Sequence, residues 1–337
     1  MTASQSSLIG PIRMRAELQR WPLAAPFRIA GHTFEEVAVL VITLEKDGQQ
    51  GRGEATGVYY RDDNAASMLR QIERVRTVVE RGMTQEGIQT LLPPGGARNA
   101  LDCALWDLEA RVSGIPVWRN AGLNEPRAIL TTFTCGADKP DRMAVTARAY
   151  KHAQAIKLKL VGDTEDAGRV RAVREARTDV WLGVDANQAF TPAFFEQLMP
   201  VLQEMKVDLI EQPFPVGQDS LLDVLRSPIP IAADESVQTV ADIPSLVGRF
   251  NVINIKLDKC GGFTEALRMV QTSLEFGLDA MVGNMIGTSL AMAPAFLVGQ
   301  RCKIVDLDGP IFLKGDREIA VQYSNGLIEC PAGLWGH

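Results

Sequence analysis

The first sixty residues follow a β-type pattern of apolar and polar positions. Val37–Leu44 is a run of mostly apolar and β-branched residues, and the Glu-Lys-Asp-Gly segment at 45–48 predicts a hairpin turn with Asp-Gly at its tip. The period becomes helical from Asn64 to Gly82 and again from Ala97 to Val112, where apolar side chains recur every three or four residues. Strands followed by helices predict a small α+β domain, which we place at residues 1–125.

After residue 125, short apolar runs alternate with amphipathic segments of helical period. Seven runs are strand candidates: Ala155–Leu160, Val180–Asp185, Asp208–Glu211, Ile229–Asp234, Val252–Lys256, Ala280–Gly283 and Ile304–Asp308. Strand–helix alternation predicts parallel βαβ units, and this many units favour an α/β fold with a closed (β/α)7–8 barrel of the TIM type. We expect the barrel at residues 126–310, and a C-terminal segment, 311–337, that returns to the first domain, which would cap the barrel.

Composition excludes several classes of protein. The 337 residues include 35 Lys and Arg against 41 Asp and Glu, a formal net charge of −6. This acidic balance argues against a nucleic-acid binder, and no stretch approaches the roughly 20 apolar residues of a membrane span. Five scattered cysteines fit reduced thiols, and three histidines are too few for a multi-histidine metal centre. We expect a cytoplasmic protein that forms a homo-oligomer.

Polar residues close the predicted barrel strands. In chain order they are Lys157 with Lys159, Asp185, Glu211, Asp234, Lys256, Asn284, and Asp306 with Asp308. Successive members, counted from Lys157, lie 22 to 28 residues apart, which is about one strand plus one helix. Because the carboxyl ends of barrel strands meet at one mouth, we expect these side chains to share a site.

Three of these residues are acids at consecutive strand ends: Asp185, Glu211 and Asp234. Carboxylates are hard oxygen ligands that suit Mg²⁺ better than zinc. Any one of them alone could instead cap a helix N-terminus. Three in register, with lysines before and after them, favour a Mg²⁺ site.

The lysines indicate proton transfer. Lys157 and Lys159 share one face of their strand, with apolar neighbours on the other, and Lys256 approaches from across the barrel. Adjacent ammonium groups near a cation repel, so we expect the pKa values of Lys157 and Lys159 to be lowered. Mg²⁺ can stabilise the enediolate formed when a carbon next to a carboxylate loses its proton. Two opposed lysines indicate 1,1-proton transfer, whereas the use of one face would indicate elimination or cycloisomerisation.

Several motifs resemble those of the enolase superfamily in its muconate-lactonizing subgroup. They are Lys157-Leu158-Lys159, Asp185-Ala186-Asn187, Glu211-Gln212-Pro213, Asp234-Glu235-Ser236, residues 254–259 (Asn-Ile-Lys-Leu-Asp-Lys) and, in the capping domain, residues 98–107. The resemblance implies Lys or His bases acting with Mg²⁺. The branch with an Asp/His dyad is excluded, because no histidine lies between His152 and His337.

By this resemblance, Lys159 and Lys256 would be the acid/base pair and Lys157 would hold the substrate carboxylate. Thr134 would also contact the substrate, and the three acids would bind Mg²⁺. Asp306 and Asp308 form an acidic pair that suits the free ammonium group of a dipeptide, and they resemble the motif of dipeptide epimerases of the L-Ala-D/L-Glu type. The alternatives are a cycloisomerase, a lyase or an N-acylamino acid racemase of the same branch. For residues 306–310 themselves, the alternative to a substrate site is a solvated turn.

The second side chain of the dipeptide is less well specified. The family's Ala-Glu epimerases are expected to meet the Glu side chain with an arginine in the loop near residues 23–34, but Gly31 stands at the matching position. Arg28 is offset from it and is the remaining candidate. Asn284 stands where a cysteine is expected on the seventh strand. We therefore expect tolerance for uncharged or apolar second residues.

Overall fold

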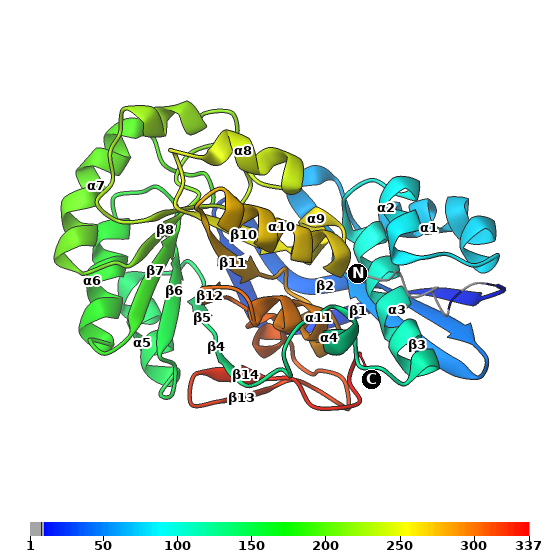
Figure 1. Ribbon diagram of the computed structural model, residues 1–337. Coiled ribbons are helices and arrows are strands. Elements are labelled where there is room, and N and C mark those ends of the chain that lie inside the picture. Colours follow the sequence, from blue (N-terminus) through cyan, green and yellow to red (C-terminus); the bar gives the residue numbers. More distant parts are fainter. Residues whose placement is uncertain (1–7, 9, 337) are drawn as a thin grey trace.

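The computed structural model describes residue 8 and residues 10–336, which form two connected parts (Figure 1). The first part holds a three-stranded antiparallel sheet in the order β1-β2-β3, with helices packed on it. Its elements are β1 (Arg13–Ile29), β2 (His32–Lys46), β3 (Gln49–Ala55), η1 (Tyr59–Arg61), α1 (Ala65–Glu80), α2 (Gln85–Leu91), α3 (Gly96–Ser113) and α4 (Val117–Asn120). Residues 1–7, 9 and 337 of the predicted domains lie outside the described residues.

Strand β2 has two buried faces, which explains its unbroken apolar run. Leu40, Ile42 and Leu44 pack in one apolar core with residues of α1 and α3. Val39 and Val41 point to the opposite face and belong to the core that continues into the barrel. Since side chains alternate along a strand, β2 lies between the two cores and joins them.

Local signals set the ends of these elements as the sequence predicts. Asp47 and Gly48, with φ of 50° and 75°, form the tight turn between β2 and β3. The side chain of Asn64 caps α1 by accepting a hydrogen bond from Ser67 N at 3.1 Å. Gly114, with φ of 69°, ends α3 in the left-handed conformation that glycine adopts without strain.

The second part is a parallel sheet of eight strands in the described residues, in the order β5 to β12. They are β5 (Phe133–Cys135), β6 (Ala155–Lys159), β7 (Trp181–Asp185), β8 (Leu209–Glu211), β9 (Ile231–Ala233), β10 (Val252–Lys256), β11 (Asp279–Gly283) and β12 (Ile304–Val305). Thr132 N, beside β5, donates to Val305 O in β12 at 2.9 Å and so links the two edges. The predicted (β/α)7–8 barrel is confirmed, with eight strands among the described residues.

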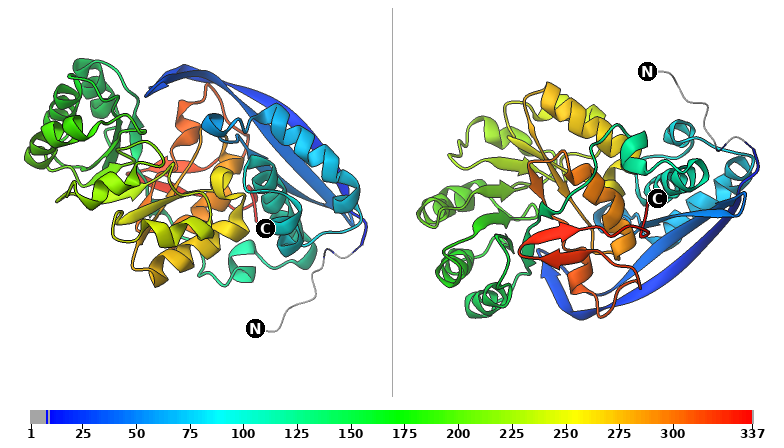
Figure 2. Two further views of the ribbon diagram at one scale, coloured as in Figure 1. Left: turned by 90° about the horizontal axis from the view of Figure 1, so that it is seen from above. Right: turned by 60° about the horizontal axis from the view of Figure 1, so that its bottom comes forward.

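Helices surround the sheet (Figures 1 and 2). They are α5 (Pro140–Ala149), α6 (Asp166–Ala176), α7 (Pro192–Glu204), η2 (Asp219–Asp223), η3 (Val240–Asp242), α8 (Ile243–Leu246), α9 (Leu257–Cys260), α10 (Phe263–Glu275), α11 (Ser289–Gly299) and η4 (Gly309–Phe312). Helix α11 was not predicted, because nearly all its residues are buried and it lacks the polar face that makes a helical period visible. No helix among the described residues has the length and apolar character to cross a membrane.

The C-terminal segment contacts both parts of the molecule. Strands β13 (Gln322–Ser324) and β14 (Leu327–Glu329) extend a small antiparallel sheet from β4 (Ile129–Leu130), drawn in red beside the barrel in Figure 2. Beyond them, Trp335 Nε1 donates to Cys103 O at 3.1 Å, on helix α3. The segment thus runs back to the first part, although the domain boundaries themselves stay a prediction.

Asp258 joins the two parts beside the barrel mouth. Its Oδ1 accepts hydrogen bonds from Thr56 N at 2.9 Å and Gly57 N at 2.8 Å, just beyond β3. Burial raises the pKa of this carboxyl to about 7, against about 4 in an unfolded chain. The folded state therefore binds the proton more tightly, so this carboxyl makes the free energy of unfolding fall as pH rises from about 4 through 7.

We expect Asp258→Asn to remove this dependence, because the amide oxygen can still accept both hydrogen bonds. Relative to the variant, the parent protein should lose up to about 4 kcal/mol of unfolding free energy between pH 4 and pH 8. Urea unfolding at several pH values measures it, with Asp47→Asn at the exposed hairpin turn as the control. A difference between parent and variant that stays constant with pH would contradict the assignment.

Candidate active site

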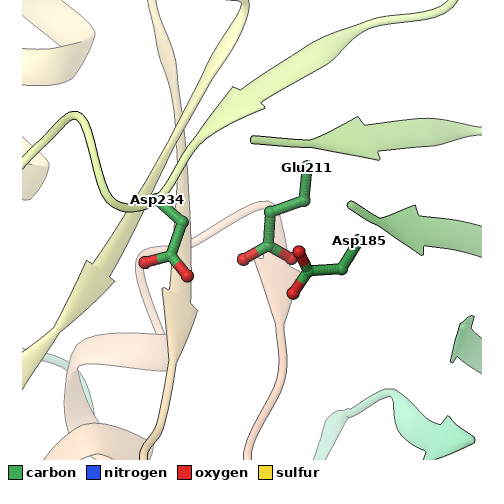
Figure 3. Close-up of side chains that lie close together, drawn as sticks. All are labelled: Asp185, Glu211 and Asp234. Carbon is green, nitrogen blue, oxygen red and sulfur yellow. The ribbon is translucent and has the colours of Figure 1, made fainter. Parts of the chain in front are cut away.

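Three carboxylates meet at the mouth of the barrel. Asp185 ends β7, Glu211 ends β8 and Asp234 follows β9, and all three are buried. One oxygen atom from each lies within 4.8 Å of the others, and Figure 3 shows the three groups turned toward a common point. The alternative, in which they serve only as helix caps, does not account for this convergence.

The charges of the cluster indicate that a cation belongs there. Burial, and then the charge of Asp185, raises the pKa of Glu211 to about 7. Burial acts on Asp234 in the same direction, but Lys256 and Lys259 outweigh it and hold its pKa well below the usual range. Three buried carboxylate ligands fit a hard divalent cation such as Mg²⁺, which would relieve the repulsion between them.

Two lysines flank the carboxylates from separated strands. Lys159 Nζ, at the end of β6, lies 2.5 Å from Asp185 Oδ2. Lys256 Nζ, at the end of β10, lies 2.6 Å from Asp234 Oδ2. Because β7, β8 and β9 stand between their strands, the ammonium groups approach the cluster from different sides, as the sequence predicts.

A second group of buried polar residues adjoins the cluster through Lys157. Its Nζ lies 3.1 Å from Glu211 Oε2 and also donates to Asp306, which accepts from Thr132 Oγ1 as well. Asp308 accepts from Thr134 N at 2.6 Å, and burial together with Asp306 raises its pKa to about 7. Strands β5, β6 and β12 therefore bring Thr134, Lys157, Asp306 and Asp308 together.

The expected lowering of the lysine pKa is wrong for Lys157. Burial disfavours its charged form, but Asp306, Glu211 and Asp185 outweigh burial and raise its pKa well above the ordinary value. The same balance, led by Asp234 among the charges, raises the pKa of Lys256. The prediction considered repulsion between neighbouring lysines and left out the acids that face each ammonium.

A cavity of about 240 Å³ opens beside the two flanking lysines. Barrel residues on its wall include Lys159, Lys256, Asp234 and Asn284. Much of the remaining wall is apolar or aromatic, and Glu36, Asp63 and Glu235 are acidic residues on it; the apolar and aromatic residues include Phe27, Ile29, Phe34, Val37, Tyr59, Tyr60 and Ile286. Asn284 Nδ2 also donates to Asp306 O at 2.5 Å, so it joins the cavity to the acidic pair.

Arg28 does not reach this cavity. Its backbone oxygen accepts from Ala137 N at 2.9 Å, which fixes the tip of the β1–β2 hairpin against the barrel. Its side chain is exposed and lines a neighbouring depression with Gly31, His32 and Lys139. Among the described residues that line the cavity, none is an arginine.

Two polar residues that contact the cluster were not predicted to do so. Asn254 Nδ2 donates to Glu211 Oε1 at 2.6 Å, and its inward position on β10 is shared with Lys256. Lys259 Nζ lies 2.5 Å from Asp234 Oδ1. Lys259 stands beyond the strand in the short helix α9, so the alternation along β10 could not place it.

Comparison with known proteins agrees with this geometry. Residues 142–333 match the family described as enolase C-terminal domain-like, and residues 12–122 match the mandelate racemase/muconate lactonizing enzyme N-terminal domain. The chain belongs to the enolase superfamily. Among its relatives, the L-Ala-D/L-Glu epimerase of Escherichia coli is 38% identical, over 91% of this chain and 96% of its own length. The N-acetyl-D-glutamate racemase of a Pseudoalteromonas species is 36% identical, over 88% and 95%.

Solved structures of superfamily members are similar throughout. An Agrobacterium tumefaciens enolase family member, with bound sodium and L-Ala-L-Glu, has a TM-score of 0.93 at 36% identity and covers 97% of this chain and 100% of its own. The dipeptide epimerase of Enterococcus faecalis, solved with Mg and L-Leu-L-Tyr, has a TM-score of 0.87 at 29% identity, with coverage of 98% and 99%. The named relatives are epimerases and racemases, which are isomerases that act on amino acid derivatives.

Proposed function

We propose that this chain is a Mg²⁺-dependent dipeptide epimerase that inverts the second residue of its substrate. The observation that carries the proposal is the pair Lys159 and Lys256, which flank three convergent carboxylates from β6 and β10. Dipeptide epimerases among the relatives support it over a cycloisomerase, a lyase or an N-acylamino acid racemase. A small-molecule dipeptide is thus the proposed partner.

The proposed mechanism assigns one proton transfer to each lysine. Asp185, Glu211 and Asp234 would hold Mg²⁺, which would supply positive charge to balance the negative charge that develops on the substrate carboxylate as the α-proton leaves. One lysine, in its neutral form, removes the α-proton on its side of the second residue. The other, as an ammonium, delivers a proton to the opposite face, so the configuration inverts and no proton is gained or lost overall. In the reverse direction the two exchange roles.

The remaining residues bind the two ends of the substrate. Lys157 would hold the carboxylate, since its ammonium already lies against the metal-binding cluster. Asp306 and Asp308 would accept the free ammonium group, with Thr134 beside them, and buried acids are suited to this because a cation neutralises them.

We further infer that the protein is cytoplasmic, and the five unpaired cysteines support this inference. The predicted homo-oligomer has no support in the structure of one chain and stays a prediction.

The cavity wall supports apolar or uncharged side chains at the second residue, and a panel of L-Ala-L-X dipeptides with Mg²⁺ tests this. Apolar wall residues such as Phe34 and Ile286 have no arginine beside them to meet a Glu side chain, so we expect X = Leu to be epimerised at least as well as X = Glu. Formation of the L-Ala-D-X product measures kcat/KM. A preference of more than tenfold for Glu, about 1.4 kcal/mol, that is lost in Arg28→Ala would contradict this and assign Arg28 to the Glu side chain.

A further inference from the structure

The carboxylate of Asp234 is shared between two lysines that contact different oxygen atoms. Lys256 Nζ lies 2.6 Å from Oδ2, and Lys259 Nζ lies 2.5 Å from Oδ1. All three side chains are buried. A metal ion bound through either oxygen would repel the ammonium group on that oxygen and compete with it, so we expect one of these contacts to be released when a metal binds.

The surroundings of each lysine decide which contact is permanent. Within the described residues, Asp234 is the one hydrogen-bond partner of Lys256 Nζ, and Lys256 lines the cavity. Lys259 Nζ donates to Asp234 Oδ1, to the backbone oxygen of Asp234 and to Asn254 O, the last at 3.0 Å. An ammonium has three N–H donors, so the contacts of Lys259 with Asp234, just after β9, and with Asn254, within β10, satisfy all three.

We propose that Lys259 is a positioning residue for the metal site: it fixes Asp234 through Oδ1, so that Oδ2 faces the cation, while Lys256 leaves the same carboxylate to act on the substrate. The inference rests on the proposed function. It deepens that function by assigning different roles to the two lysines on Asp234: Lys259 would help metal binding by orienting the carboxylate, and Lys256 would compete with the metal for it.

Two physical effects compete at Lys259. Its positive charge repels a nearby Mg²⁺, and this alone would make binding tighter when the charge is removed. Two of its three hydrogen bonds hold Asp234, and their loss leaves buried acceptors unpaired and the ligand free to turn. Loss of a group that orients a metal ligand typically weakens metal affinity by about 10–100-fold, so we expect orientation to outweigh repulsion. At Lys256 only repulsion and competition operate.

Titration calorimetry of the full chain with Mg²⁺ alone tests the proposal. We expect Lys259→Met to raise the Kd for Mg²⁺ by about 10–100-fold, and Lys256→Met to leave it unchanged or lower it. Lys303→Met, which removes an exposed pair with Asp279, is the control and should leave the Kd unchanged. Raising the Mg²⁺ concentration should then restore kcat in Lys259→Met but never in Lys256→Met.

The outcomes separate this inference from the proposed function. If the parent protein binds no Mg²⁺, the proposed function fails. If it binds Mg²⁺ and both lysine variants bind it more tightly, Lys259 acts through its charge alone and the inference is overturned. Lys259→Gln keeps two N–H donors without the charge and provides a milder variant. Circular dichroism measures whether the Lys259 variants are folded. If both variants lost their folded structure, the inference would also be overturned, because Lys259 would then be a structural residue.

Discussion

Lys159→Ala and Lys256→Ala are each expected to abolish epimerisation while preserving exchange of the α-proton on one face of the substrate. If the two lysines serve opposite faces of the substrate, either variant lacks the group that delivers or removes the proton on one face. The loss in rate should reach about 10²–10⁴-fold or more, the usual contribution of an acid/base group. The surviving lysine can still exchange the α-proton that faces it.

The decisive signature is stereospecific residual exchange. In D₂O, Lys159→Ala should exchange the α-proton of one epimer of the dipeptide and Lys256→Ala that of the other, as measured by proton NMR. Lys151→Ala, at an exposed lysine outside the site, serves as the control and should behave like the parent protein. Equal residual exchange of both epimers in either variant would rule out the assignment of one lysine to each face.

Glu211→Gln is expected to have the other large effect, because it removes the central carboxylate of the cluster. Glu211 lies between Asp185 and Asp234 in the order of strands, and it contacts Lys157 and Asn254 as well. Loss of a charged ligand should weaken Mg²⁺ binding and remove several kcal/mol of transition-state stabilisation. About 4 kcal/mol corresponds to a fall in kcat/KM of about a thousandfold.

The control for this variant lies close by in the chain. Asp208 directly precedes β8, at the end away from Glu211; it is exposed and accepts a hydrogen bond from Leu182 N at 2.8 Å. Asp208→Asn keeps an acceptor there and should leave kcat/KM within about twofold, since surface substitutions of this kind are usually within about 0.5 kcal/mol. If Glu211→Gln retained the Mg²⁺ affinity and activity of the parent protein, Glu211 would not be a ligand.

The convergence of the three carboxylates could be predicted because the fold converts spacing in the sequence into position. Asp185, Glu211 and Asp234 end consecutive strands of a parallel barrel, and that topology alone brings them to one mouth. Lys159 and Lys256 follow the same rule from β6 and β10, which have three strands between them. The prediction needed only the strand ends, and short apolar runs mark strand ends clearly in a sequence.

Other features depend on contacts that no local pattern records. Strand β5 has three residues, too few to show a period, yet it carries Thr134. The pKa of Lys157 depends on Asp306, which is 149 residues away in the chain. Arg28 lies near the expected position in the sequence, but the hairpin tip turns it away from the cavity. Lys259 is placed by the turn of α9, which begins where the strand pattern stops.

Exchange of the α-proton with solvent deuterium in the parent protein tests the central claim most directly. With Mg²⁺ and an L-Ala-L-X dipeptide in D₂O, proton NMR should show the α-proton of the second residue disappear while that of the first residue remains. Chelation of the metal should stop the exchange. Retention of the α-proton across a broad dipeptide library, with Mg²⁺ present and the protein folded, would contradict the account.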